Sequence, residues 1–590
     1  MKYLFLEVIF FVFLIGFYAF HTLILYDPSK LYSTSIAHLL QVNALLQGRL
    51  SLSPQPFGLP HDFIWGIHGI QQAWGFGVPL LELPFEWIAQ KCGFDPFPDR
   101  LILLFYLILM IAVINIALKL ALKTLEITAH SLMGTLMRFY LVAWILFNPT
   151  MSHPELDVYG QTILYGCIYG YILLSLLLIY VLRPTSQLFF GLCLASGLAW
   201  LIRPTLLAFG VVTFGLVAAR AYQNRCGIRL MISGILGFCL GIALQLGLNY
   251  YCFGSILEFG YSGQYSKFLS VYCYRFGFPF QHEHFGGAFK ELMGALFFNN
   301  LWATPTVRYR GPTIFHFNVS HLMVIGIGFL SLFSIMFSRL LRESLKNVIL
   351  LLSFGTISFL LLFIFYLRFP FLCTTYWADF TVSYSAVLIA LIMMGYAFIT
   401  SYSNKKYLSL LFIFAGIFFC LNNKLFFNHD PHQYDLATDK KGVQQIIHRF
   451  NRDILYRYDL PQTFYCGSHY YFSRLYHQFE GWKKNQDCSV FPSTLFFLPS
   501  NRCLSLNYSI LKDQKVPPVQ LKRDFTFMKL TDTNVLKDNS GALRITQRFC
   551  SDVSISNRPS LYVIGWVEPD QLNWYSLPIT LNWVSVADKQ

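Results

Sequence analysis

Charged residues are scarce in this chain, and apolar residues are in excess. Asp, Glu, Lys and Arg together make up 13% of the 590 positions, whereas 55% are apolar. Soluble globular domains carry roughly 25% charged residues, so this composition excludes a soluble globule. The chain is therefore predicted to be an α-helical polytopic membrane protein.

Several other features are missing from the sequence. It contains no nucleic-acid-binding motif, no internal repeat and no low-complexity linker. The net charge of +14 comes from scattered basic residues, which suit loops at an anionic lipid surface. Membrane lipids are therefore expected as partners, and nucleic acid is not. The first apolar run, residues 3–26, lacks a small-residue cleavage site, which predicts a retained anchor.

The few charges are unevenly distributed. Of the 74 charged residues, 35 follow Asn423, in little more than a quarter of the chain. This shift predicts two domains, a membrane domain at 1–422 and a water-soluble domain at 423–590. We call residues 423–590 the tail.

Eleven stretches are long and apolar enough to be predicted as membrane spans, since about 20 apolar residues cross a ~30 Å hydrocarbon core. They are 3–26, 101–122, 138–153, 162–182, 186–202, 204–220, 230–250, 319–338, 347–367, 378–400 and 407–422. Basic clusters in short loops stay in the cytoplasm. The basic residues that set the orientation are Lys119, Lys123, Arg138, Arg220, Arg225, Arg229, Arg339, Arg342, Lys346, Lys405 and Lys406. They place the N-terminus inside, and the odd number of spans then places the tail outside.

The tail is predicted to be a small mixed α/β or β-rich domain. A helical pattern covers 438–450, and the strand-like runs are "TLFFL", "DFTFMKL", "SLYVIGWV" and "LPITLNWVSV". Its four cysteines, Cys466, Cys488, Cys503 and Cys550, permit two disulfides in any of three pairings.

Acidic residues at the ends of apolar runs are the first candidates for chemistry on a membrane substrate. Asp27 ends the first run, Asp62 lies in the loop that follows, and Glu155 with Asp157 lies in a short loop between two runs. Each also has a purely structural reading, as a turn residue or a polar helix cap. Residues 36–46 predict an amphipathic helix lying in the interface and ending near Gly48, and "WGFGVPLLELPFEWI" predicts a bent re-entrant or interfacial segment.

Arg203 stands between two apolar runs and is followed by a helix-breaking proline. A buried arginine is costly unless an anion or an acid pairs with it, and phosphate fits a guanidinium through two parallel hydrogen bonds. The alternative is that Arg203 extends to the nearer membrane surface.

Taken in order, these stretches resemble a known family. The resemblance rests on the acid after the first span and on "LLQGRLSL", "HDFIWGIHGIQQAWGFGVPLLELPF", "PELDVYGQ", "GLAWLIRPT" and "FGSILEFGY", which together cover residues 1 to about 265. The chain is similar to the bacterial polyprenyl-phosphate-sugar-dependent glycosyltransferases of the multi-spanning GT-C fold, related to protein mannosyltransferases and aminoarabinose lipid A transferases. It departs from the commonest form of that family at Asp27, which is followed by Pro28 instead of a second acid.

The resemblance implies an inverting glycosyltransferase in the bacterial inner membrane. It would move a sugar from a polyprenyl-phosphate donor to a lipid, glycan or protein acceptor on the exported face. Asp27 would be the general base, with Asp62 as the alternative. Glu155 and Asp157 would orient the acceptor or a metal, and Arg203, Arg275 and Arg368 would bind the donor phosphate.

No cofactor is implied with certainty. A divalent metal, Mg²⁺ or Mn²⁺, is left open and its ligands are unassigned; residues 281–285, "QHEHF", carry ligand-type side chains but stand as a single cluster. Two rival functions are a multi-spanning transporter or flippase and a non-catalytic envelope assembly protein. Transporters usually show two matching halves, which this sequence lacks, and eleven spans exceed what anchoring needs.

Overall fold

The structure is a computed structural model. It describes residues 2–20, 31–33, 37–52, 63–66, 69–72, 75–124, 132–146, 151, 158–257, 259, 346–368, 378–402, 457–458, 494–499, 502–510, 519–523, 526–537, 543–552, 559–566 and 579–586.

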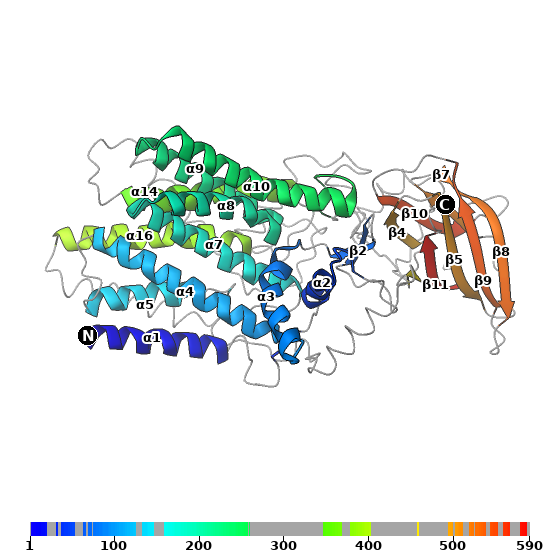
Figure 1. Cartoon of the computed structure of the whole chain (residues 1–590), viewed down its shortest axis with the longest axis horizontal. Coiled ribbons are helices and arrows are strands. Elements are labelled where there is room, and N and C mark those ends of the chain that lie inside the picture. The colour runs from blue at the N-terminus through cyan, green and yellow to red at the C-terminus, as the bar shows by residue number, and fades with distance from the viewer. Residues whose placement is uncertain are drawn as a thin grey trace, which may run out of the picture.

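A bundle of apolar helices forms the N-terminal part of the molecule (Figure 1). Its helices are α1 (Lys2–Tyr18), α4 (Asp99–Thr124), α5 (Leu132–Leu146), α7 (Val158–Leu182), α8 (Ser186–Ile202), α9 (Leu207–Gln223), α10 (Ile228–Phe253), α14 (Lys346–Arg368) and α16 (Thr381–Tyr402). In the described ranges, five stretches are long and apolar enough to cross a membrane: Asp99–Lys123, Gly160–Leu182, Pro204–Gln223, Ile228–Phe253 and Val348–Leu367. The helices are thus compatible with the predicted membrane class. The predicted spans 319–338 and 407–422 lie outside the described residues.

Two shorter helices and a hairpin lie at the end of the bundle that faces the C-terminal sheets, which we call the sheet end (Figure 1). They are α2 (Ala37–Leu46), α3 (Gly77–Cys92) and the antiparallel pair β1 (Phe63–Gly66) and β2 (Gly69–Gln72). The helix predicted at 36–46 is confirmed as α2, and the turn that follows it contains Gly48, whose φ of +72° favours glycine. Most of α2 is buried within the protein, including His38 and Gln41, and its position in the membrane interface stays a prediction.

Close approach of α3 to the end of α8 depends on two glycines. A Cβ atom on Gly77 would lie 2.5 Å from atoms of Ile202, and one on Gly75 would lie 2.5 Å from the Leu201 carbonyl oxygen. Gly75 also has a φ of +87°. The "GFG" part of the sequence therefore allows α3 to pack closely against α8. The segment "WGFGVPLLELPFEWI", expected to be bent and re-entrant or interfacial, forms most of α3, with Pro84 inside the helix.

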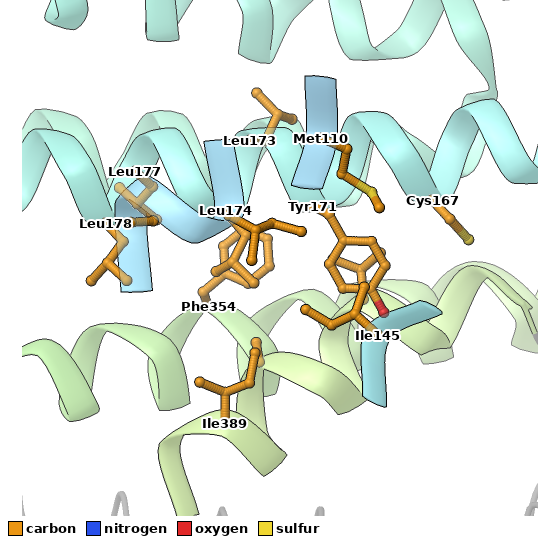
Figure 2. Packing of buried hydrophobic residues seen from close by; sticks show 14 of the residues in the cluster. Met110, Ile145, Cys167, Tyr171, Leu173, Leu174, Leu177, Leu178, Phe354 and Ile389 are labelled. Atoms are coloured by element: carbon orange, nitrogen blue, oxygen red, sulfur yellow. The ribbon is translucent and has the colours of Figure 1, made fainter. Parts of the chain in front are cut away.

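The middle of the bundle is packed with apolar side chains (Figure 2). Met110 of α4, Ile145 of α5, Leu174 of α7, Phe354 of α14 and Ile389 of α16 belong to one buried cluster. Two buried hydroxyl groups in this layer, those of Tyr171 and Ser385, form a hydrogen bond of 2.7 Å.

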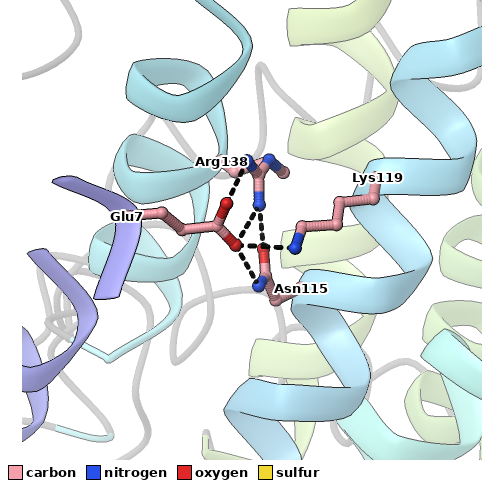
Figure 3. Close-up of polar contacts among 4 residues, drawn as sticks. All are labelled: Glu7, Asn115, Lys119 and Arg138. Atoms are coloured by element: carbon pink, nitrogen blue, oxygen red, sulfur yellow. Dashed lines mark hydrogen bonds and ion pairs between the residues drawn. The ribbon is translucent and has the colours of Figure 1, made fainter. Parts of the chain in front are cut away.

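An ion cluster holds α1 to α4 and α5 near the end where α1 begins (Figure 3). The Glu7 carboxylate accepts hydrogen bonds from Arg138 Nη1 at 2.8 Å and Arg138 Nη2 at 2.9 Å. Lys119 Nζ lies 2.7 Å from Glu7 Oε1, and Asn115 Nδ2 donates to the same oxygen at 2.9 Å.

The prediction that Arg138 lies in a cytoplasmic loop is wrong. The fifth helix begins at Leu132 and not at 138, so Arg138 lies inside it and is completely buried. The guanidinium tolerates that position because Glu7 neutralises it through two parallel hydrogen bonds.

The C-terminal part consists of antiparallel sheets (Figure 1). One sheet has the order β4-β10-β6-β7 and the other β3-β11-β5-β9-β8. The strands are β3 (Arg457–Tyr458), β4 (Thr494–Pro499), β5 (Cys503–Ile510), β6 (Val519–Arg523), β7 (Thr526–Phe527), β8 (Lys529–Lys537), β9 (Leu543–Cys550), β10 (Pro559–Trp566) and β11 (Ile579–Val586). The hairpin strand β1 of the N-terminal part lies against β4.

The predicted strands match β4, β10 and β11 closely, and "DFTFMKL" covers β7 and the start of β8. Strands β5, β6 and β9 were not predicted. The helix expected at 438–450, together with Cys466 and Cys488, lies outside the described residues. A disulfide joins Cys503 to Cys550, which are paired positions on the neighbouring strands β5 and β9.

We expect the disulfide to stabilise the five-stranded sheet by roughly 4 kcal/mol, since it closes a loop with a sequence separation of 47 residues. Replacing both cysteines by serine in the full chain should reduce amide hydrogen-exchange protection in β5 and β9. Cys92→Ser, at an exposed free cysteine, is the control and should leave that protection unchanged. Equal protection in all three proteins would contradict the prediction.

Candidate functional site

Most of the predicted site residues fall outside the described part of the chain. Asp27, Asp62, Glu155, Asp157 and Arg275 are in this group, as are residues 281–285. Arg368 is the last residue of α14. Arg203 is the predicted site residue whose surroundings the structure gives in detail.

Arg203 occupies the break between α8 and α9. Its backbone is extended, with φ −159° and ψ 140°, and Pro204 begins a 3-10 turn that covers Pro204–Leu206. Proline disfavours helical backbone in the residue before it and has no N–H to donate, so the helix stops at Ile202. The break was predicted from the sequence.

The Arg203 side chain points into the protein and pairs with Asp379. Arg203 Nη2 lies 3.2 Å from Asp379 Oδ2, and both side chains are buried. The Tyr366 hydroxyl, near the end of α14, donates to the same Asp379 oxygen. Arg203 therefore does not extend to the surface, and the alternative that it does so is wrong.

Asp379 was not predicted as a site residue, although its position in the sequence could have indicated it. Asp379 lies in the short 3-10 turn Ala378–Phe380 directly before α16, where it is an acid next to an apolar run. A buried arginine needs an acid or an anion as its partner. A search for such a partner among the acids next to the other predicted spans would have included Asp379. The structure supplies the acid internally.

A second polar group at the sheet end is centred on Asp99, the first residue of α4. Its carboxylate accepts hydrogen bonds from the Ser33 backbone N–H at 2.9 Å and from Gln161 Nε2 of α7 at 2.6 Å. His38 Nε2 of α2 lies 3.1 Å from the Thr162 hydroxyl. These contacts join α2, α4 and α7 where their ends meet.

Helix α3 adds two more buried acids to this end. The Glu86 carboxylate accepts the Phe97 backbone N–H at 2.7 Å, whereas Glu82 is completely buried. Burial, together with the charges of Asp99 and Glu86, raises the pKa of Glu82 well above its ordinary value. Chemically, the sheet end offers several buried acids and a guanidinium held by a carboxylate.

Within the ranges that the structure describes, no group of three or more His, Cys, Asp or Glu side chains could hold a metal ion. The acids predicted to orient a metal, Glu155 and Asp157, are not in those ranges. The choice between Mg²⁺, Mn²⁺ and no metal therefore stays a prediction.

Comparisons with known proteins add no relative. No protein-family model matches the chain. No curated protein sequence matches it significantly either.

We expect loss of one partner of the Arg203 and Asp379 pair to destabilise the protein strongly. Asp379→Leu would leave a buried guanidinium without its carboxylate, which typically costs about 3–5 kcal/mol. The double variant Arg203→Met with Asp379→Leu removes both charges and should recover much of that loss. Thermal unfolding of the purified full chain in detergent measures both; a double variant as unstable as the single one would contradict the pairing.

Proposed function

We propose that this chain is a membrane glycosyltransferase that moves a sugar from a polyprenyl-phosphate donor to an envelope acceptor. The observation that carries the proposal is the gathering of buried acids and an arginine at one end of an apolar bundle, next to α2 and α3. A lipid-linked sugar has its tail in the hydrocarbon layer and its reacting carbon at the membrane surface. Polar chemistry at the helix ends, beside an apolar interior, suits such a substrate.

The proposed reaction is an inverting transfer. Asp27 accepts the proton of the acceptor hydroxyl, the acceptor oxygen forms a bond with the anomeric carbon, and the bond from that carbon to the phosphate oxygen breaks. The polyprenyl phosphate leaves with the bonding electrons. Arg203, Arg275 and Arg368 stabilise its negative charge, Glu155 and Asp157 orient the acceptor or a metal, and Asp62 is the alternative base.

The pairing of Arg203 with Asp379 fits a role at the donor phosphate. A guanidinium fixed by a carboxylate on one nitrogen still has other N–H groups in the same plane, and that planar geometry suits two phosphate oxygens. Asp379 thereby becomes a positioning residue for Arg203 in this proposal.

The eleven-span GT-C architecture is part of the proposal. Nine of the eleven predicted spans coincide with bundle helices in the described part of the chain, which supports it. We place the protein in the bacterial inner membrane with the sheets on the exported face. The disulfide between Cys503 and Cys550 supports this side, because such bonds persist in oxidising compartments.

A transporter is the less favoured function. Transporters bind substrate and coupling ions near the membrane midplane, often at broken helices. The described middle of this bundle is a continuous apolar cluster, and the ion pairs between described side chains of the bundle lie toward its two ends.

The proposed reaction predicts that Asp27→Asn abolishes sugar transfer while the protein still inserts into the membrane. Loss of a general base typically lowers a rate by ~10²–10⁴-fold. Mass spectrometry of envelope glycolipids and glycans should find a modified species in cells with the wild-type protein, and little of it with the variant. If Asp62→Asn abolishes transfer while Asp27→Asn does not, Asp62 is the base; if no species depends on the wild-type protein, the proposal fails.

The proposed topology predicts opposite sides for two positions in the chain. A reporter fused after Lys406 should be cytoplasmic, and one fused at Gln590 should be exported, because a predicted span lies between them and basic loops stay inside. Reporters on the same side of the membrane would remove the exported tail from the proposal. A fusion after Lys123, expected inside, is the control for reporter function.

A further inference from the structure

Glu82 is buried without the polar contacts that an ionised carboxylate needs. It lies on α3 with no exposed surface, near the buried Tyr165 of α7. Among the described residues, neither oxygen of Glu82 has a hydrogen-bond partner, and the Tyr165 hydroxyl has none either. An isolated carboxylate in such a place would cost several kcal/mol, so the neutral form is strongly favoured.

The neighbouring acids Asp99 and Glu86 differ from Glu82 because both accept hydrogen bonds. Asp99 receives donors from Ser33 and Gln161, and Glu86 receives the backbone N–H of Phe97. Donors of this kind favour the ionised form of a carboxyl group, and Glu82 has none of them. A negative charge on Asp99 or Glu86 also opposes one on Glu82.

In the described part of the chain, the other elements packed against α3 do not supply a compensating cation. Helix α8 contains no acidic or basic residue, and the one such residue in α2 is His38, which contacts Thr162 instead. On α4, the cation near this group is Arg100, which acts on Asp99, and Tyr106 donates its hydroxyl to the Leu81 carbonyl at 2.9 Å. Among the described residues, no group of three or more His, Cys, Asp or Glu side chains, these acids included, could hold a metal ion.

We propose that Glu82 is a proton-binding site at the sheet end of the bundle, occupied at neutral pH. Its ligand is a proton, held where α3 meets the ends of α4 and α7. Loss of the proton would leave a negative charge on Glu82 with no hydrogen-bond donor among the described residues, and would weaken the packing of α3 against those helices. The inference does not depend on sugar transfer, and a failure of the proposed function would leave it intact.

The sign of the pH dependence follows from where the proton is bound. The folded protein keeps the proton on Glu82 at pH values where the unfolded chain has already lost it, so unfolding releases a proton. Stability is therefore greatest below the ordinary glutamate pKa and falls as pH rises toward the raised value in the folded protein. Each pH unit in that window should lower the ratio of folded to unfolded protein about tenfold.

The test compares thermal unfolding of the full chain in detergent over a pH series for the wild type, Glu82→Gln and the control Asp95→Asn. Glutamine keeps the shape and neutral charge of a protonated glutamate. We therefore expect Glu82→Gln to reduce the fall in unfolding temperature with rising pH and to be the more stable protein at alkaline pH, while Asp95→Asn follows the wild type. Equal pH dependence in the wild type and Glu82→Gln would overturn the proposal.

Infrared spectroscopy of the folded protein gives a second readout that does not require the variant to be stable. The wild type should show the carbonyl stretching band of a buried protonated carboxyl group at neutral pH, and raising the pH should remove it. Absence of the band in the wild type would overturn the proposal. Loss of the band on adding NaCl or MgCl₂ at neutral pH would also overturn it, because a metal cation would then be the ligand.

Discussion

The bundle depends on two buried arginines, Arg138 and Arg203, that are each neutralised by a buried carboxylate. Arg138 is completely buried, and its guanidinium makes two hydrogen bonds to Glu7. Removing either partner would leave a charge in a medium that solvates it poorly, at a cost of about 3–5 kcal/mol. The pair therefore fixes α1 against α5, and Lys119 with Asn115 extends the same contact to α4.

The same constraint shapes the sheet end. Pro204 stops α8, and the extended backbone at Arg203 turns the side chain toward Asp379, which stands before α16. One break in a helix thereby joins α8 and α9 to α14 and α16 through an ion pair and the Tyr366 hydroxyl. Glu82 differs from the other acids at this end, because neither of its oxygens has a hydrogen-bond partner among the described residues, and burial favours its neutral form.

Local patterns predicted some elements well and others poorly. The span predicted at 186–202 has the bounds of α8, and the break at Arg203 was found, because run length and proline act locally. The start of α5 was misplaced by six residues, since a buried arginine looks like a loop charge until Glu7 is known to face it. Strands β5 and β9 carry polar residues at positions that the sheet buries, such as Asn507 and Gln547, so their alternation is weak.

The sequence by itself determined the membrane class, the positions of most bundle helices and the strand-rich tail, because composition, run length and helix-breaking residues act over a few neighbours. Only the tertiary structure decided which partners meet: Glu7 with Arg138, 131 residues apart, Arg203 with Asp379, and Cys503 with Cys550. It also decided that α2 is buried and that Glu82 lies beside Tyr165. The physical reason is that the energy of a charge or a thiol depends on its neighbours in space. The order of residues along the chain does not show which distant residues become those neighbours.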